Sequence, residues 1–236
     1  MLRTLFGDPP RKAEGELAEA FEWMERFVRL MNDRISAGKD GERKLRTYEL
    51  WTIGLMASLD ELEQSRYAAR RFAARVRKPS LARMTEEEQL DYYRHVYFDK
   101  NAFIRVFAIL DKLGTFMNDL FGLETEKIKS HFSYFTVLRG MRQRNLHPAL
   151  TAVLGKLKDG SREPMANLRK RRNTEIHYMN TELMDDLVQS HQSYRADFEL
   201  EDLEAQMSDL DQSFAMVTQT LCAAFEYAAR LPNLNR

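Results

Sequence analysis

The amino-acid sequence predicts an all-α fold, and three observations support this prediction. Only 10 Gly and 6 Pro occur in 236 residues, so turns are few and the elements between them are long. Apolar residues recur in steps of three and four along most of the chain, which is typical of amphipathic helices. No stretch of useful length alternates as a half-buried strand would. The chain is also long enough to bury a substantial core.

The expected helices are separated by short breaks. We expect them at residues 17–35, 43–76, from 85 onward, 98–121, 126–141, 148–158, from about Pro164 onward and 203–221. Thr85 and Glu88 can form a capping box. The segment KDGSREP, residues 158–164, is expected to be a loop. We predict one helical domain in residues 85–236, with residues 1–84 forming an N-terminal helical hairpin packed on it.

The first and last long helices carry apolar stripes with alternating steps of four and three. Their members are Leu17, Phe21, Met24, Val28, Met31 and Ile35, and Leu203, Met207, Leu210, Phe214, Val217 and Leu221. Such a stripe indicates packing in a bundle, and less often a seam for a coiled coil or a protein partner. We therefore expect both stripes in the core.

Composition leaves few classes of function. Lys plus Arg equals Asp plus Glu at 36 each, so any binding of a polyanion must come from a local patch. We find no secretion signal and no apolar stretch long enough to span a membrane, and we expect a cytoplasmic protein without membrane contacts. The single Cys222 excludes an intrachain disulfide and is expected to be a buried structural thiol.

Motifs for nucleotide, metal or serine-nucleophile chemistry are missing from the sequence. There is no phosphate-binding loop, no G-x-G-x-x-G, no H-E-x-x-H and no G-x-S-x-G. None of the five His lies within a helical turn of another, so we expect neither a metal site nor a cofactor.

Two basic segments remain. Residues 66–83 contain seven cationic residues and no acid, which indicates either a solvated helix face or a groove for a phosphate backbone. The segment RKRRNTEIHYMN, residues 169–180, places four cationic residues before an Asn and a His. On a helix Arg169, Asn173 and His177 share one face.

Arg172 and His177 have side chains suited to metal-free RNA cleavage, in which the 2′-hydroxyl attacks its own phosphodiester. A histidine can transfer a proton near neutral pH, and a guanidinium can hold a phosphate with two hydrogen bonds. The two residues lie about 140° apart around an ideal helix. They converge only if the helix ends, bends or faces a second copy. Alternatively, His177 is a helix-capping or core histidine.

The segment RNTEIHYMN resembles the R-x4-6-H motif of the HEPN superfamily, with Asn173 as the polar residue that follows the arginine. Residues 92–123 are similar to the long helix of the Cthe-like HEPN subgroup. The residues that carry this likeness are Tyr92, Tyr93, Arg105, Asp111, Lys112, Phe121 and Gly122. The resemblance covers residues 85–225.

The resemblance implies an up-and-down HEPN-like helical bundle that dimerises with its two motifs facing each other across a cleft. It further implies a metal-independent endoribonuclease, a toxin or defence effector, that leaves a cyclic phosphate. Arg172 would clamp the phosphate, His177 would transfer the proton, and Asn173 would orient one of them. Arg171 is a second candidate for the clamp. We expect RNA contacts from Arg169, Lys170, Arg171 and Tyr178.

One departure and two alternatives accompany this resemblance. Members paired with a nucleotidyltransferase antitoxin have a Tyr two residues after the His, where this chain has Met179. Modification by such an antitoxin is therefore not expected, although an antitoxin or another protein partner stays open. The first alternative is a catalytically inactive HEPN module that binds RNA, nucleotide or a protein partner. The second is an interaction protein that uses the apolar stripes of its terminal helices.

Overall fold

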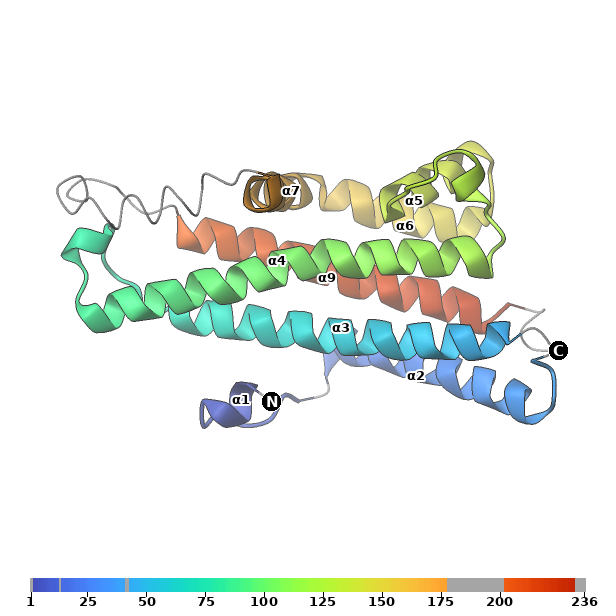
Figure 1. Ribbon diagram of the computed structural model, residues 1–236, viewed down its shortest axis with the longest axis horizontal. Helices are drawn as coiled ribbons and strands as arrows, with labels where there is room; N and C mark the ends of the chain where they lie inside the picture. Colours follow the sequence, from blue (N-terminus) through green and yellow to red (C-terminus); the bar gives the residue numbers. More distant parts are fainter. Residues whose placement is uncertain (1, 13, 41–42, 178–201, 232–236) are drawn as a thin grey trace.

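The computed structural model describes residues 2–12, 14–40, 43–177 and 202–231, and these form helices and no strand. Four long helices run along the molecule (Figure 1): α2 (Gly15–Ser36), α3 (Lys44–Ala73), α4 (Glu86–Leu120) and α9 (Leu203–Ala229). Three further helices cover one side of them: α5 (Tyr134–Gln143), α6 (Pro148–Gly160) and α7 (Arg162–His177). The short elements are α1 (Leu2–Leu5), η1 (Leu81–Arg83) and η2 (Thr125–Lys127). The predicted all-α bundle is confirmed.

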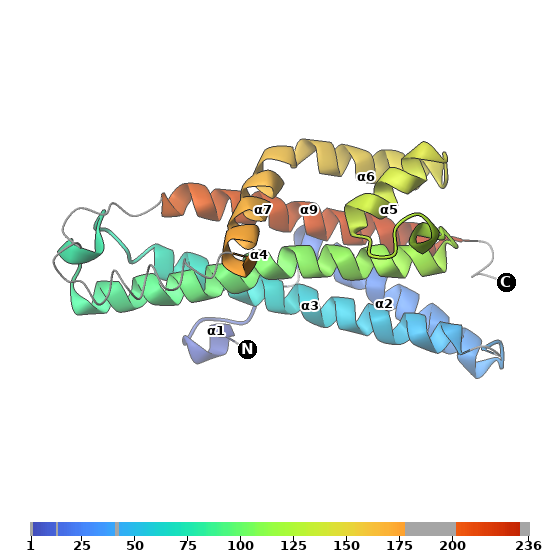
Figure 2. The ribbon, with the colours of Figure 1, turned by 45° about the horizontal axis from the view of Figure 1, so that its top comes forward.

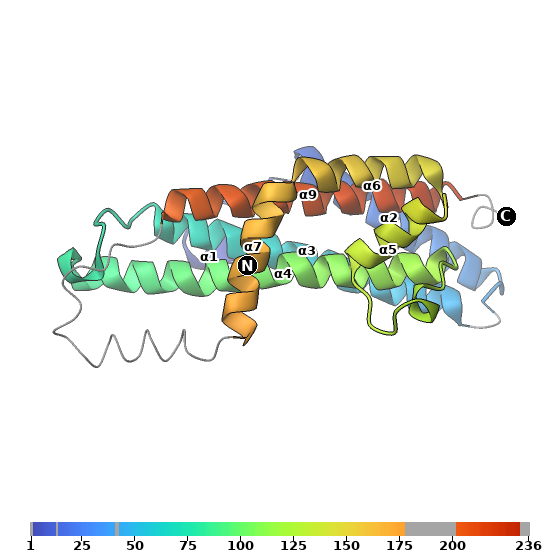
Figure 3. The same ribbon diagram turned by 90° about the horizontal axis from the view of Figure 1, so that it is seen from above.

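The long elements alternate in direction. The colours in Figure 1 show that α2, α4 and α9 run one way along the molecule and that α3 and α6 run the other way. α7 then leaves the end of α6 and crosses α9 and α4 at a steep angle (Figure 2, Figure 3). It is therefore the described helix that departs most from the common axis, and it is the helix that carries the basic motif.

Aromatic rings from three long helices meet at the centre of the core. Phe27 of α2, Phe116 of α4 and Phe225 of α9 are all buried, with ring centroids 4.9 to 5.6 Å apart. Tyr48 of α3 completes this cluster with its ring 6.0 Å from that of Phe116. Such edge and tilted contacts stabilise a core beyond the burial of area alone.

The apolar stripes of α2 and α9 lie inside this core. Met24, Met31, Leu210 and Leu221 are among their fully buried members. Leu17, Phe21 and Ile35 are partly buried and pack against the core, so the expectation of core packing is confirmed for most members of the two stripes. Buried residues of α2 and α3 belong to the same core cluster as those of the later helices. The division into two domains at residue 84 stays a prediction.

Three local predictions were wrong. The helices expected from residue 85 and over residues 98–121 are one continuous helix, α4. Residues 158–164 do not form a loop, because α6 continues to Gly160 and α7 begins at Arg162. Pro164 fits there as the third residue of α7, where a backbone N–H would have no partner in its own helix. The helix expected over residues 126–141 is divided into η2 and α5.

A close approach between α4 and α5 fixes where α5 begins. A Cβ atom on Gly114 would lie 2.8 Å from the Cα atom of Tyr134, so only glycine admits this contact. The backbone N–H of Tyr134 also donates to Asp111 Oδ1 at 3.3 Å. The start of α5 is thus held against α4 one turn from Asp111.

Thr85 caps α4 as predicted, but the capping box is only half formed. Thr85 Oγ1 accepts from the backbone N–H of Glu88 at 3.2 Å. The Glu88 carboxylate instead accepts the backbone N–H groups of Arg77 and Lys78. It therefore ties the preceding connection to the helix start.

Cys222 is half-buried against the core, and burial raises the pKa of its thiol to about 12. The thiol is therefore protonated at neutral pH, which fits a structural role. Among the described helices, none combines the length and apolarity that crossing a bilayer requires.

Candidate functional site

α7 is attached to the bundle by two buried apolar residues near its start and by polar contacts further along the helix. Met165 and Leu168 are buried and lie three residues apart, on the face that continues toward Arg171 and Arg172. In the last turn Glu175 pairs with Lys100 of α4 at 3.0 Å. The sequence therefore supplies an apolar start and a charged remainder for the crossing helix.

The side chain of Arg171 connects α7 with α4 and α9. Its guanidinium pairs with Asp99 of α4 and donates to Gln206 Oε1, near the start of α9, at 3.3 Å. It also lies over the ring of Phe103, 4.9 Å from the centroid. Because the side chain of Asp99 is only 3% exposed, this contact neutralises a buried carboxylate. Arg171 therefore has a structural task.

Arg172 is placed differently. Its guanidinium lies 4.6 Å from the ring centroid of Phe107, and Nε and Nη2 donate to Asn173 Oδ1 at 3.2 and 2.8 Å. Among the described residues no carboxylate lies within ion-pair distance of it. Asn173 thus orients the arginine that precedes it, and the cation is held in place while staying available to an anion.

The other cations of the motif point to different surroundings. Arg169 lies over the ring of Phe135 of α5, with 5.2 Å between its guanidinium carbon and the centroid. Lys170 is exposed on the opposite side from the core. His177 is the last residue of α7, and its side chain, like all of Tyr178, lies outside the described residues.

α4 presents a row of four residues to α7 that sequence reasoning recognised only in part. Asp99, Phe103, Phe107 and Asp111 follow at four-residue spacing, so they share one face of the helix. Of these four, Asp111 belonged to the family resemblance. Asp99 was missed, although its spacing from Phe103 was a usable signal. Arg105 and Lys112, by contrast, face α3, where they contact Glu61 and Ser58.

Asp111 interacts electrostatically with both Arg169 and Arg172. Partial burial raises the pKa of its carboxyl above the usual value. The hydrogen bond from the Tyr134 N–H and the charges of Arg172 and Arg169 lower this pKa, but the effect of burial is larger. An aspartate with a raised folded-state pKa contributes stability below its unfolded pKa and loses that contribution as the pH rises through the folded value. The charged carboxylate is therefore a net cost to the fold at neutral pH.

We expect Asp111→Asn to raise the Tm at neutral pH, because it removes the partly buried charge while Oδ1 can still accept the Tyr134 N–H. The difference from wild type should shrink as the pH is lowered toward the pKa of Asp111. Thermal unfolding followed by circular dichroism over a series of pH values measures this. A lower Tm of the variant at neutral pH would show that the attraction to Arg169 and Arg172 prevails.

Two histidines outside the motif, His95 and His147, are engaged within the fold. His95 is buried, with Nδ1 2.9 Å from the carbonyl oxygen of Ala69, and burial lowers the pKa of its imidazole. His147 Nδ1 lies 2.9 Å from the hydroxyl of Tyr227, and its pKa is also lowered by burial. Within the described parts of the chain, no three His, Cys, Asp or Glu side chains are grouped as metal ligands.

The basic segment 66–83 is largely neutralised by acids of the same chain. Arg66 and Arg70 both pair with Asp211 of α9, Arg71 pairs with Asp8, and Arg75 pairs with Asp91. Four of its seven cations thus hold the fold together. A groove for phosphates along this helix is not favoured by these contacts.

A family model described as HEPN_Cthe2314-like HEPN matches residues 51–229. The match covers more than half of the chain and includes α4, α7 and α9 as well as most of α3. With this helical bundle and an Arg-Asn-His motif on its crossing helix, the chain belongs to the HEPN_Cthe2314-like HEPN family. Comparisons with curated proteins and with solved structures give no significant match.

Proposed function

We propose that the protein is a metal-independent endoribonuclease in which Arg172 binds the scissile phosphate and His177 transfers the proton. One observation carries the proposal. Arg172 is held by Phe107 and Asn173 without an acidic partner among the described residues, while the neighbouring Arg171 is taken up by Asp99. Of the two arginines that the motif allows as clamp, Arg172 is therefore the one with a free charge.

The proposed reaction needs only groups that this chain supplies. A base takes the proton of the ribose 2′-hydroxyl, whose oxygen attacks the adjacent phosphorus. The bond from phosphorus to the 5′-oxygen breaks, and that oxygen takes a proton as it leaves. The products carry a 2′,3′-cyclic phosphate and a 5′-hydroxyl. Arg172 stabilises the charge that builds on the phosphoryl oxygens.

A homodimer would complete the proposed site. The C-terminal end of α7 extends beyond α4 at the side of the bundle (Figure 3), where the motifs of two copies could face each other. Two copies of His177 would then provide both the base and the acid. We further propose a cytoplasmic toxin or defence effector, controlled by an antitoxin or another protein partner.

The chemistry of the 2′-hydroxyl gives a direct test. We expect purified wild-type protein to cleave RNA in the presence of EDTA and to leave 2′,3′-cyclic phosphate ends. The same sequence with 2′-O-methyl riboses should bind but stay intact, because its 2′-oxygen cannot be deprotonated. Gel analysis of end-labelled oligonucleotides measures both.

Each other result points to a different mechanism. Cleavage of the 2′-O-methyl strand would contradict attack by the 2′-hydroxyl. Binding of RNA without any cleavage would assign the protein to the inactive HEPN modules that only bind RNA, nucleotide or a partner.

A further inference from the structure

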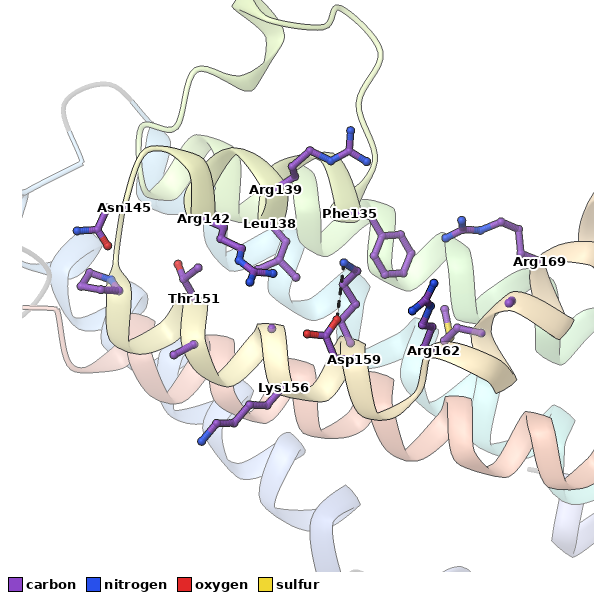
Figure 4. A pocket seen from close by; sticks show the side chains of 16 residues that line it. Phe135, Leu138, Arg139, Arg142, Asn145, Thr151, Lys156, Asp159, Arg162 and Arg169 are labelled. Atoms are coloured by element: carbon purple, nitrogen blue, oxygen red, sulfur yellow. Dashed lines mark ion pairs between the residues drawn. The ribbon is translucent and has the colours of Figure 1, made fainter.

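A basic groove lies between α5, α6 and α7, beside the motif. It has a volume of about 950 Å³ and is partly open to solvent. Figure 4 shows the side chains that line it. Six cationic residues line it: Arg139, Arg142, Lys156, Lys158, Arg162 and Arg169. Asp159 is the one acid among the lining residues, and it pairs with Lys158 at 4.0 Å. The groove therefore has a large local excess of positive charge in a chain whose formal net charge is zero.

The arginines of this groove differ from most others in the described structure. Arg139, Arg142, Arg162 and Arg169 are all exposed, and no carboxylate of the described residues lies within ion-pair distance of any of them. By contrast, the arginines of the segment 66–83 are mostly paired with acids. Four cations gathered without counter-charges repel one another, and an anionic ligand would remove that cost.

The groove also offers an aromatic surface and open space. In Figure 4 Phe135 lies beside Leu138 on α5, with Arg142 on one side of it and Arg169 on the other. Its ring is half-buried and has the Arg169 guanidinium over it. Ala152, Gly155 and Ala166 add little bulk, and a Cβ atom on Gly155 would meet nothing within 4 Å.

We infer that this groove binds the sugar-phosphate backbone of single-stranded RNA, with Phe135 as a stacking surface for one base. Unpaired arginines beside an accessible aromatic ring are the combination by which single strands are held without sequence preference, and the half-buried ring of Phe135 keeps part of its surface accessible. Arg169 belongs to both the groove and α7, so a strand in the groove continues toward Arg172. The inference rests on the proposed function for its choice of RNA, but the binding itself needs no catalysis.

The test uses full-length protein and a fluorescein-labelled 2′-O-methyl RNA strand, which cannot be cleaved by the proposed mechanism. We expect the double variant Arg139→Gln with Arg142→Gln to weaken binding about tenfold. The slope of the logarithm of the association constant against the logarithm of the salt concentration should become shallower by about 0.7 for each arginine removed. The control is Arg26→Gln with Arg29→Gln, a pair of exposed arginines at the same spacing on α2, far from the groove (Figure 1), of which Arg29 pairs with Glu25 at 3.8 Å. This pair should leave binding and its salt dependence unchanged. Fluorescence anisotropy measures both quantities.

A second variant places a negative charge in the groove without removing an arginine. Gly155→Glu adds a carboxylate where there is room, and a helix tolerates Glu better than Gly, so the fold should keep its Tm. We expect it to weaken RNA binding, and Gly155→Gln to leave it unchanged. Phe135→Leu should weaken binding with little change in salt dependence, because it removes stacking and no charge.

Failure of this inference and failure of the proposed function give different results. The groove assignment would be overturned if the Arg139/Arg142 double variant and Gly155→Glu both bound the strand with wild-type affinity. It would also be overturned if the wild-type protein did not bind the strand. Competition by polyglutamate as strong as that by RNA would overturn the choice of RNA. If wild type leaves natural RNA uncut while binding still depends on the groove, the groove stands and the ribonuclease does not.

Discussion

Substitution of His177 by alanine is expected to lower the rate of RNA cleavage in EDTA by about 10²–10⁴-fold, the usual contribution of a positioned acid or base. The affinity for 2′-O-methyl RNA should stay close to that of wild type, because the cations of α7 and the groove remain. Single-turnover cleavage and anisotropy with the same sequence separate these two quantities. The structural control is His131→Ala, an exposed histidine in the connection between η2 and α5.

Variants of Arg172 then distinguish clamping from general charge. Arg172→Ala should lower cleavage by about 10²–10³-fold, as removal of one stabilising donor does elsewhere. Arg172→Lys keeps the charge but loses the planar pair of donors, so it should recover only part of the rate. Equal cleavage by wild type and His177→Ala would show that the activity belongs to a contaminant or to another group. A rate unaffected by Arg172→Ala would contradict its role as clamp.

The extent of the helices could be predicted because helix formation depends on local patterns. The steps of three and four, the cap at Thr85 and the scarcity of Gly and Pro each act within one or two turns. The errors also have local causes. Gly160 and Pro164 lie at the end of α6 and in the first turn of α7, where both residues are tolerated, so they did not produce the expected loop. The start of α5 depends instead on contact with Gly114, twenty residues earlier.

The contacts of the site could not be read from the sequence for a different reason. Arg171 and Arg172 are neighbours in the motif, but successive residues point about 100° apart around a helix. Which of them meets Asp99 depends on where α7 crosses α4, and that follows from the packing of Met165 and Leu168. The same holds for the segment 66–83, whose Arg66 and Arg70 meet Asp211 across the bundle. Sequence patterns predict which face a residue lies on, whereas its partner depends on tertiary geometry.

Substitution of Asp99 by alanine is expected to lower the free energy of unfolding by about 2–4 kcal/mol, because it leaves the Arg171 cation without its carboxylate. A fully buried pair would lose more, but the Arg171 side chain keeps 21% of its surface exposed and can recover some hydration. In a chain of this length the Tm should fall by roughly 4–16 °C. Denaturant unfolding and calorimetry measure the two values.

The double variant Asp99→Leu with Arg171→Met tests whether the pair is structural or part of the RNA site. It removes both charges together and fills their space with apolar side chains, so we expect it to recover most of the stability lost by Asp99→Ala. If Arg171 only positions α7, the double variant should also cleave RNA at nearly the wild-type rate, with Arg172 still over Phe107. If the double variant is stable but does not cleave RNA, Arg171 would be the residue that binds the phosphate. That result would contradict the assignment of this role to Arg172.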